Sequence, residues 1–294
     1  MERLPLELLP CLLVGLLLGW KLPWLPTWLA PPLIRWGVPL SLAALLLRSP
    51  LSSSLLRVGL VGVLAPVLTL ALPLAWPPLR RQIGHRVLIL GAAVGNTGYW
   101  GLPVAIALLP PQTMAAVAAY DVAGTFITWS VGPLVLLGAR GSLAKVASTF
   151  FASPALQGLA LSVVVGQTPW HADLAQALWW PARLVFLVAL TLVGMRLGLT
   201  LRDRSLVLSA GLPWALLLKL VVAPVMVWFL ANLFHLPSLE REALVLQGAA
   251  PTALSVLFLA EARKEAVPLA STLVLTSTVL AMITVPLWWS LIRG

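Results

Sequence analysis

The chain consists of long apolar runs separated by short charged or Pro/Gly-rich connections. A run of about 20 apolar residues is long enough to cross a bilayer as a helix. The pattern predicts ten such spans, at residues 6–20, 33–47, 55–76, 87–109, 114–137, 151–166, 180–199, 206–234, 243–260 and 267–292. We therefore expect an all-α polytopic membrane protein of ten transmembrane helices.

The fourth span contains residues that a continuous membrane helix does not favour. Gly95-Asn96-Thr97-Gly98-Tyr99-Trp100-Gly101-Leu102-Pro103 places three glycines, a polar pair and a proline at membrane depth. Non-helical backbone at that depth is tolerated only where it is buried in protein or lines a watery cavity. The stretch predicts an unwound, substrate-facing helix that breaks at Pro103.

The two halves of the chain repeat several features in register. The repeat-related features are Ala65-Pro66 and Ala223-Pro224, Arg35 and Arg183, Gly132-Pro133 and Val285-Pro286, and Pro103 and Pro251. Two halves of five spans must lie in opposite orientations, because five is odd. We expect an inverted repeat, residues 1–140 and 149–294, in which broken helices 4 and 9 cross at the substrate site.

Composition supports a membrane protein. Of the 294 residues, 60% are hydrophobic and 10% charged, and the mean hydropathy is +1.00. The net charge of +10 suits the positive-inside rule rather than nucleic-acid binding, since the Lys and Arg fall in short loops. Their distribution predicts a multi-pass protein of the plasma (inner) membrane with both termini on the non-cytoplasmic side.

The broken spans provide candidate ligands for an anion. A half-helix that starts after a break offers free N–H groups and the positive end of its dipole. We expect the substrate to contact the following residues: Asn96, Thr97, Gly98, Tyr99, Gly101, Pro103, Pro251, Thr252 and Ser255. Asp121 and Lys219 are charged residues within predicted spans, and they are candidates for coupling or for structural pairing.

Other chemistry is not indicated. Cys11 is the only cysteine, and the three histidines, His85, His171 and His235, fall in predicted loops without a second ligand at metal spacing. The chain has no HExxH motif and no second intramembrane aspartate for an acid pair. We expect no enzyme activity, metal or cofactor.

The residues 96–103 resemble the Asn-Thr-x-x-x-Gly-x-Pro crossover motif of the auxin efflux carrier family, which includes plant PIN proteins and bacterial dicarboxylate permeases. The stretch from Pro251 to Thr272 is similar to that family's ninth and tenth spans. The resemblance implies a scaffold domain (spans 1, 2, 6 and 7), a transport domain (spans 3–5 and 8–10), a homodimer through the scaffold and elevator-type movement. Thr252-Ala253 departs from the plant pattern, so auxin specificity is not implied.

The sequence thus predicts a secondary transporter of a small organic anion, a mono- or dicarboxylate, with an auxin-like acid among the candidates. A sodium-coupled bile-acid-type symporter is the alternative, because it shares crossed broken helices and would use acidic or polar ligands near the crossing. An anion channel stays open as a further alternative, and saturable counterflow would argue against it.

Overall fold

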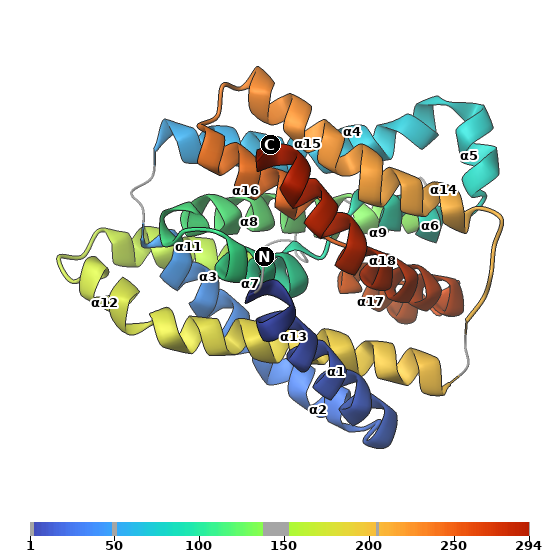
Figure 1. The fold of residues 1–294 in the computed structure, drawn as a ribbon, viewed down its shortest axis with the longest axis horizontal. Coiled ribbons are helices and arrows are strands. Elements are labelled where there is room, and N and C mark those ends of the chain that lie inside the picture. Colours follow the sequence, from blue (N-terminus) through green and yellow to red (C-terminus); the bar gives the residue numbers. More distant parts are fainter. Residues whose placement is uncertain (1–2, 49–51, 138–152, 204–205, 294) are drawn as a thin grey trace.

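The structure, a computed structural model, describes residues 3–48, 52–137, 153–203 and 206–293. These residues form a bundle of helices (Figure 1), and apart from one isolated bridge they contain no β-structure. The prediction of an all-helical polytopic membrane protein is confirmed. The predicted boundary between the two halves, at residues 140–149, lies outside the described residues.

The helices in chain order are α1 (Arg3–Lys21), α2 (Leu25–Pro32), the π-turn η1 (Leu33–Gly37), α3 (Val38–Leu46), α4 (Ser53–Ala75), α5 (Pro77–Ile83), α6 (Arg86–Ala93), the π-turn η2 (Thr97–Gly101), α7 (Leu102–Leu108), the 3₁₀ turn η3 (Pro111–Thr113), α8 (Met114–Ser130), α9 (Gly132–Leu137), α11 (Pro154–Gly166), α12 (His171–Ala177), α13 (Trp179–Arg202), α14 (Leu212–Leu217), the π-turn η4 (Leu218–Val222), α15 (Ala223–Leu233), α16 (Ser238–Gly248), α17 (Leu254–Arg263) and α18 (Val267–Arg293).

Six helical segments among the described residues are long and apolar enough to cross a membrane. They are Leu25–Leu46, Ser53–Ala75, Pro111–Leu136, Trp179–Arg202, Leu212–Leu233 and Val267–Arg293. Leu9–Lys21, Thr97–Leu108 and Pro154–Gly166 are shorter apolar helices. Each of the ten predicted spans overlaps a described helix, but the count of ten membrane crossings stays a prediction.

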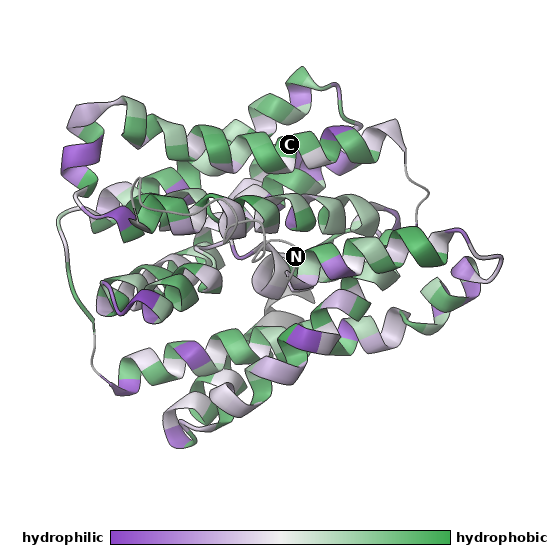
Figure 2. Ribbon diagram, turned by 180° about the vertical axis from the view of Figure 1, so that it is seen from behind, coloured by the Kyte–Doolittle hydropathy of each residue, from purple (hydrophilic) through white to green (hydrophobic). Residues whose placement is uncertain are grey.

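The outer surface of the bundle is apolar, as expected for contact with lipid. Figure 2 shows hydrophobic residues along most of each helix. Large apolar side chains such as Leu56, Val164 and Leu184 are more than half exposed. Exposed tryptophans, including Trp28 and Trp180, suit the aromatic belts at membrane–water interfaces.

Helices α1 and α13 lie side by side at one edge of the bundle (Figure 1) and pack backbone against backbone. A Cβ atom added at Gly15 would lie 2.1 Å from the carbonyl oxygen of Thr191, and one added at Gly194 would lie 2.3 Å from that of Leu12. Gly19 and Gly198 are in similarly close contact with the facing helix. Each helix thus carries two glycines four residues apart, the spacing that brings membrane helices together.

The fourth predicted span is interrupted earlier than expected. The backbone leaves the helix at Val94 and resumes at Thr97, whereas Pro103 lies in the first turn of α7. The wider π-turn η2 directly precedes it, with the N–H of Leu102 donating to the carbonyl of Thr97, so Pro103 lies in the second turn of a half-helix that runs from Thr97 to Leu108. The predicted break at Pro103 is therefore wrong: the interruption lies at residues 94–96, and Pro103 lies inside the second half-helix.

Candidate substrate site at the crossing of two broken helices

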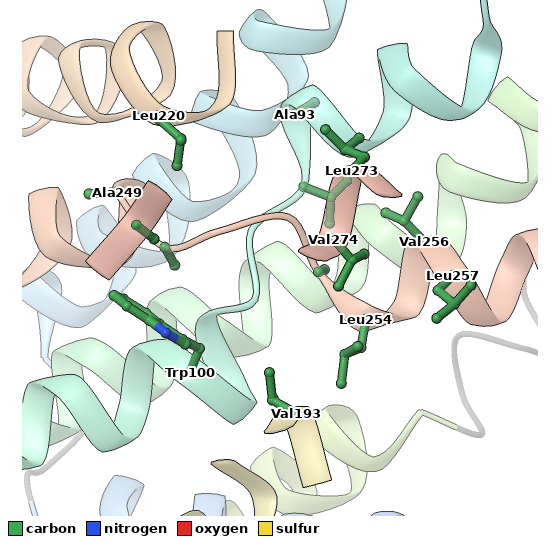
Figure 3. Close-up of a cluster of buried hydrophobic side chains, with 14 of the residues drawn as sticks. Ala93, Trp100, Val193, Leu220, Ala249, Leu254, Val256, Leu257, Leu273 and Val274 are labelled. Carbon is green, nitrogen blue, oxygen red and sulfur yellow. The ribbon is translucent and has the colours of Figure 1, made fainter. Parts of the chain in front are cut away.

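The two broken helices cross in the interior of the bundle. The second interruption runs from the end of α16 at Gly248 to the start of α17 at Leu254. In Figure 3 the two unwound segments cross: Ala93 and Trp100 flank the first, and Ala249 and Leu254 flank the second. The sequence predicted this crossing from the positions of the two breaks.

Backbone hydrogen bonds hold the crossing together. The N–H of Asn96 donates to the carbonyl oxygen of Pro251 at 2.7 Å, and the N–H of Ala253 donates to that of Val94 at 3.0 Å. Together they form an antiparallel bridge between Gly95 and Thr252. The N–H and C=O groups of unwound backbone deep in a membrane protein need hydrogen-bond partners. Here each unwound segment supplies partners for some of those groups in the other.

Side chains add further bonds across the crossing. The Thr252 hydroxyl donates to the carbonyl of Gly91 at 2.9 Å, and the Thr252 N–H donates to the hydroxyl of Ser277 at 3.1 Å. The Gln247 amide nitrogen donates to the carbonyl of Gly101 at 2.9 Å. These bonds tie the half-helices to one another and to α18.

A cavity of about 180 Å³ opens beside the crossing. Its polar wall comes from the first turns of the two half-helices that begin there: Asn96, Thr97, Gly98 and Tyr99 from one, and Ala253, Leu254 and Ser255 from the other. Its remaining wall is mostly apolar and includes Ile34, Val38, Leu102, Trp129, Ala155, Phe186 and Phe258. The first turns of helices carry N–H groups without a helical partner, so this wall favours an anion.

Asn96 lines this cavity and carries an unpaired side-chain donor. Its residue is 4% exposed, and its side-chain amide nitrogen is buried with no hydrogen-bond partner among the described residues. Buried polar groups are nearly always paired. An unpaired amide donor in the wall of a cavity therefore indicates a ligand with an acceptor atom.

Asp121 on α8 faces the same cavity. It is 4% exposed, and the Thr97 hydroxyl donates to its carboxylate at 2.5 Å. A Cβ atom added at Gly98 would lie 3.2 Å from the nearer carboxylate oxygen. The absence of a side chain at Gly98 thus lets the carboxylate approach the start of the half-helix.

Not all predicted substrate contacts line the cavity. Asn96, Thr97, Gly98, Tyr99 and Ser255 do, and so does Asp121. The other four predicted contacts lie outside its wall. Gly101, Pro251 and Thr252 make the bonds across the crossing described above, and Pro103 is buried in α7. Lys219 lies at a second, smaller cavity on the other side of the crossing.

Sequence reasoning missed several residues of the site. Trp129, Phe186 and Phe258 supply the apolar wall, and nothing distinguishes them in sequence from lipid-facing aromatics. Gln247 was detectable, since it is a polar residue inside the apolar run of the ninth predicted span. A buried amide in such a run is unfavourable without a partner.

The comparisons with known proteins point to transporters. Residues 185–294 match the model of the sodium bile acid symporter family. An uncharacterized transporter of Methanocaldococcus jannaschii is 26% identical over 216 residues, covering 70% of this chain and 68% of that protein. An uncharacterized transporter of Methanothermobacter thermautotrophicus is 26% identical over 266 residues, covering 87% and 85% of the two chains.

These matches contradict the resemblance to the auxin efflux carrier family. The Asn-Thr-x-x-x-Gly-x-Pro stretch specifies an unwound helix that crosses a second one, and both families were expected to share that geometry. The short motif therefore predicts the local structure, an unwound and crossing helix, but does not identify the family. The chain is a multi-pass membrane protein with support for a transporter function, and the family that it resembles over residues 185–294 is the sodium bile acid symporter family.

Proposed function

We propose that this protein is a cation-coupled secondary transporter that carries a small organic anion through the crossing of its broken helices, with sodium as the coupling ion. The unpaired, buried amide nitrogen of Asn96 in the wall of the main cavity is the observation that carries the proposal. The amide would donate to a carboxylate oxygen of the substrate. The first turns of η2 and α17 add N–H groups and the positive ends of two helix dipoles on the same wall.

The size and lining of the cavity favour a small carboxylate with an apolar body. A volume of about 180 Å³ corresponds to about six water molecules at liquid density. It lies below the range of pockets for drug-sized ligands. The carboxylate would face Asn96, and the hydrocarbon part would pack against Trp129, Phe186 and Phe258.

Asp121 supports cation coupling. Its carboxylate faces the cavity that we assign to an anion, and two negative charges in a buried site repel each other strongly. A sodium ion bound at Asp121 would offset that repulsion and admit the substrate. The match to the sodium bile acid symporter family agrees with this choice of ion.

The position of the cavity supports an elevator-type mechanism. One side of it comes from η1, α3, α11 and α13, which belong to the predicted scaffold spans. The other side comes from η2, α8 and α17, which belong to the predicted transport spans. A substrate between two such groups would move with the transport group. This proposal includes the ten spans in inverted repeat, the two halves, the outward termini and a homodimer through the scaffold.

Uptake into proteoliposomes tests the proposal. A panel of small aliphatic and aromatic mono- and dicarboxylates is offered with an inward sodium gradient, and again with potassium in its place. We expect saturable, sodium-stimulated uptake of at least one member, and its loss in Asn96→Ala. Asn232→Ala, on α15 at a site partly exposed and outside the cavity, is the control. Wild-type uptake by a folded Asn96→Ala protein would refute the site.

Counterflow separates a carrier from an anion channel. Vesicles preloaded with unlabelled substrate should accumulate labelled substrate transiently above its external concentration. A channel would only equilibrate the label. Uptake that is neither saturable nor capable of counterflow would favour the channel.

A further inference from the structure

The crossing has a second face, opposite in electrostatic character to the first. A small cavity there is lined by the ends of the two half-helices that stop at the crossing: Ala93 of α6 with Val94 and Gly95 that follow it, and Gln247 and Gly248 of α16. The last turn of a helix leaves carbonyl groups without a helical partner and carries the negative end of the dipole. Two such ends meet here, so this face favours a cation.

The side chain of Lys219 reaches this position. Lys219 is 1% exposed, and its Nζ donates to the carbonyl oxygen of Gly248, the last residue of α16, at 2.8 Å. A Cβ atom added at Gly95 would lie 3.3 Å from Nζ. The ammonium therefore contacts the end of one broken helix and lies beside the unwound segment of the other.

The local sequence of α14–α15 explains how the lysine is presented. Pro224 has no N–H for the carbonyl of Leu220, and the π-turn η4 occupies the turn before it. The freed carbonyl of Leu220 accepts a hydrogen bond from Trp288 Nε1 at 2.9 Å. The π-turn before Pro224 is thus stabilised by α18, and Lys219 lies within this turn.

Carbonyl dipoles, not a carboxylate, balance this charge. No acidic residue is among the lining of the small cavity, whose polar side chains other than Lys219 are Thr69, Thr97, Tyr120 and Gln247. Asp121 lines the main cavity instead, and Gly95 and Thr97 line both. A carboxylate and an ammonium therefore lie on opposite faces of one pair of unwound segments.

We propose that Lys219 is a tethered cation that fixes the crossing. Its ammonium lies between the C-termini of two helices, where it takes the place of a dissociable monovalent ion that would balance their negative dipole ends. It acts as a positioning residue: it binds the carbonyl of Gly248 and packs against Gly95, and through these two residues it fixes the half-helix starts that face the substrate. Cation coupling is then confined to the Asp121 face. The inference rests on the proposed function for its effect on transport, whereas its effect on the fold stands separately.

Chemical rescue tests this assignment. Lys219→Ala removes the equivalent of n-propylammonium, and Lys219→Met replaces the ammonium by an uncharged chain that fills the space. Both variants should transport at least about tenfold more slowly than wild type, since a buried hydrogen bond from a charged donor is lost. Added n-propylammonium should restore uptake and raise the melting temperature of Lys219→Ala. It should do neither in Lys219→Met, in wild type or in the exposed control Lys21→Ala.

Two results would overturn the assignment. One is wild-type transport and stability in Lys219→Met, which would show that no charge is needed. The other is a Lys219→Ala protein on which n-propylammonium has no effect, including failure to fold when it is purified throughout in n-propylammonium while Lys219→Met folds. The melting-temperature readout requires no substrate. If wild type carries no carboxylate, the proposed function fails while the stability result still decides the role of Lys219.

Discussion

The backbone N–H of Asn96 donates to the carbonyl oxygen of Pro251 at 2.7 Å, and this bond joins the two broken helices beside the candidate substrate cavity. Pro251 has no N–H of its own to offer in the unwound segment, but its carbonyl is free because the helix has ended. The same residue that lines the cavity and carries an unpaired side-chain donor is thus anchored by its backbone to the opposite half.

The Thr252 hydroxyl has a structural role that a substitution can isolate. It is fully buried and caps the carbonyl of Gly91 near the end of α6. Thr252→Val keeps the shape but removes the donor, so we expect a loss of about 1–3 kcal/mol of unfolding free energy. Denaturant unfolding in detergent measures it. Thr27→Val, which loses an exposed bond to the Trp24 carbonyl, should change stability by less than about 0.5 kcal/mol. Equal stabilities of the two variants would contradict this role.

The contact between α1 and α13 depends on glycine at the facing positions. Gly194→Ala would place a Cβ atom 2.3 Å from the Leu12 carbonyl oxygen, so the helices must separate, at a cost of about 1–3 kcal/mol. Gly59→Ala on α4 is the matched control, because nothing lies within 4 Å of its added Cβ atom. There we expect no loss, or a gain of about 0.5–1 kcal/mol from helix propensity. Thermal unfolding of both proteins checks the contrast, and a stable Gly194→Ala protein would refute the close packing.

Asp121 should determine the response to sodium. Asp121→Asn keeps an oxygen that accepts the Thr97 hydroxyl bond but removes the negative charge. We expect the sodium stimulation of uptake to disappear, and the rise in melting temperature on adding sodium to disappear with it, since a bound ion stabilises the folded state. The exposed Asp173→Asn should respond as wild type does. Unchanged sodium curves in Asp121→Asn would place the coupling ion elsewhere.

Arg196 and Glu261 join α13 to α17 in an ion pair of 3.5 Å. The glutamate side chain is 41% exposed, so Glu261→Gln should cost less than about 1 kcal/mol. Arg196→Ala should cost more, about 1–3 kcal/mol, because the guanidinium also packs 5.1 Å from the ring centre of Phe258, which lines the cavity. Melting temperatures of the two variants measure the difference. Equal losses would mean that the ion pair alone matters.

Much of the fold was predictable because each span carries its own signal. Apolar runs bounded by charges and prolines placed the helices, since a membrane helix satisfies its backbone internally and needs no distant partner. The polar Gly-Asn-Thr run and the Pro251 region marked the two interruptions for the same reason. The break itself was placed too late, at Pro103, because the wider π-turn before this proline lets the half-helix that begins at Thr97 continue through it.

The amino-acid pattern alone specified an all-helical membrane protein with two interrupted spans, polar residues at the first interruption, and the intramembrane charges Asp121 and Lys219. Only the tertiary structure decided which of these share a cavity. It placed Asn96 and Asp121 beside the two half-helices that begin at the crossing, Lys219 beside the two that end there, and Thr252 in a bond to Gly91. The sequence gives the direction of each half-helix, and with it the sign of the dipole at each break. Only the crossing of the two distant breaks brings the two helix starts together on one face and the two helix ends together on the other.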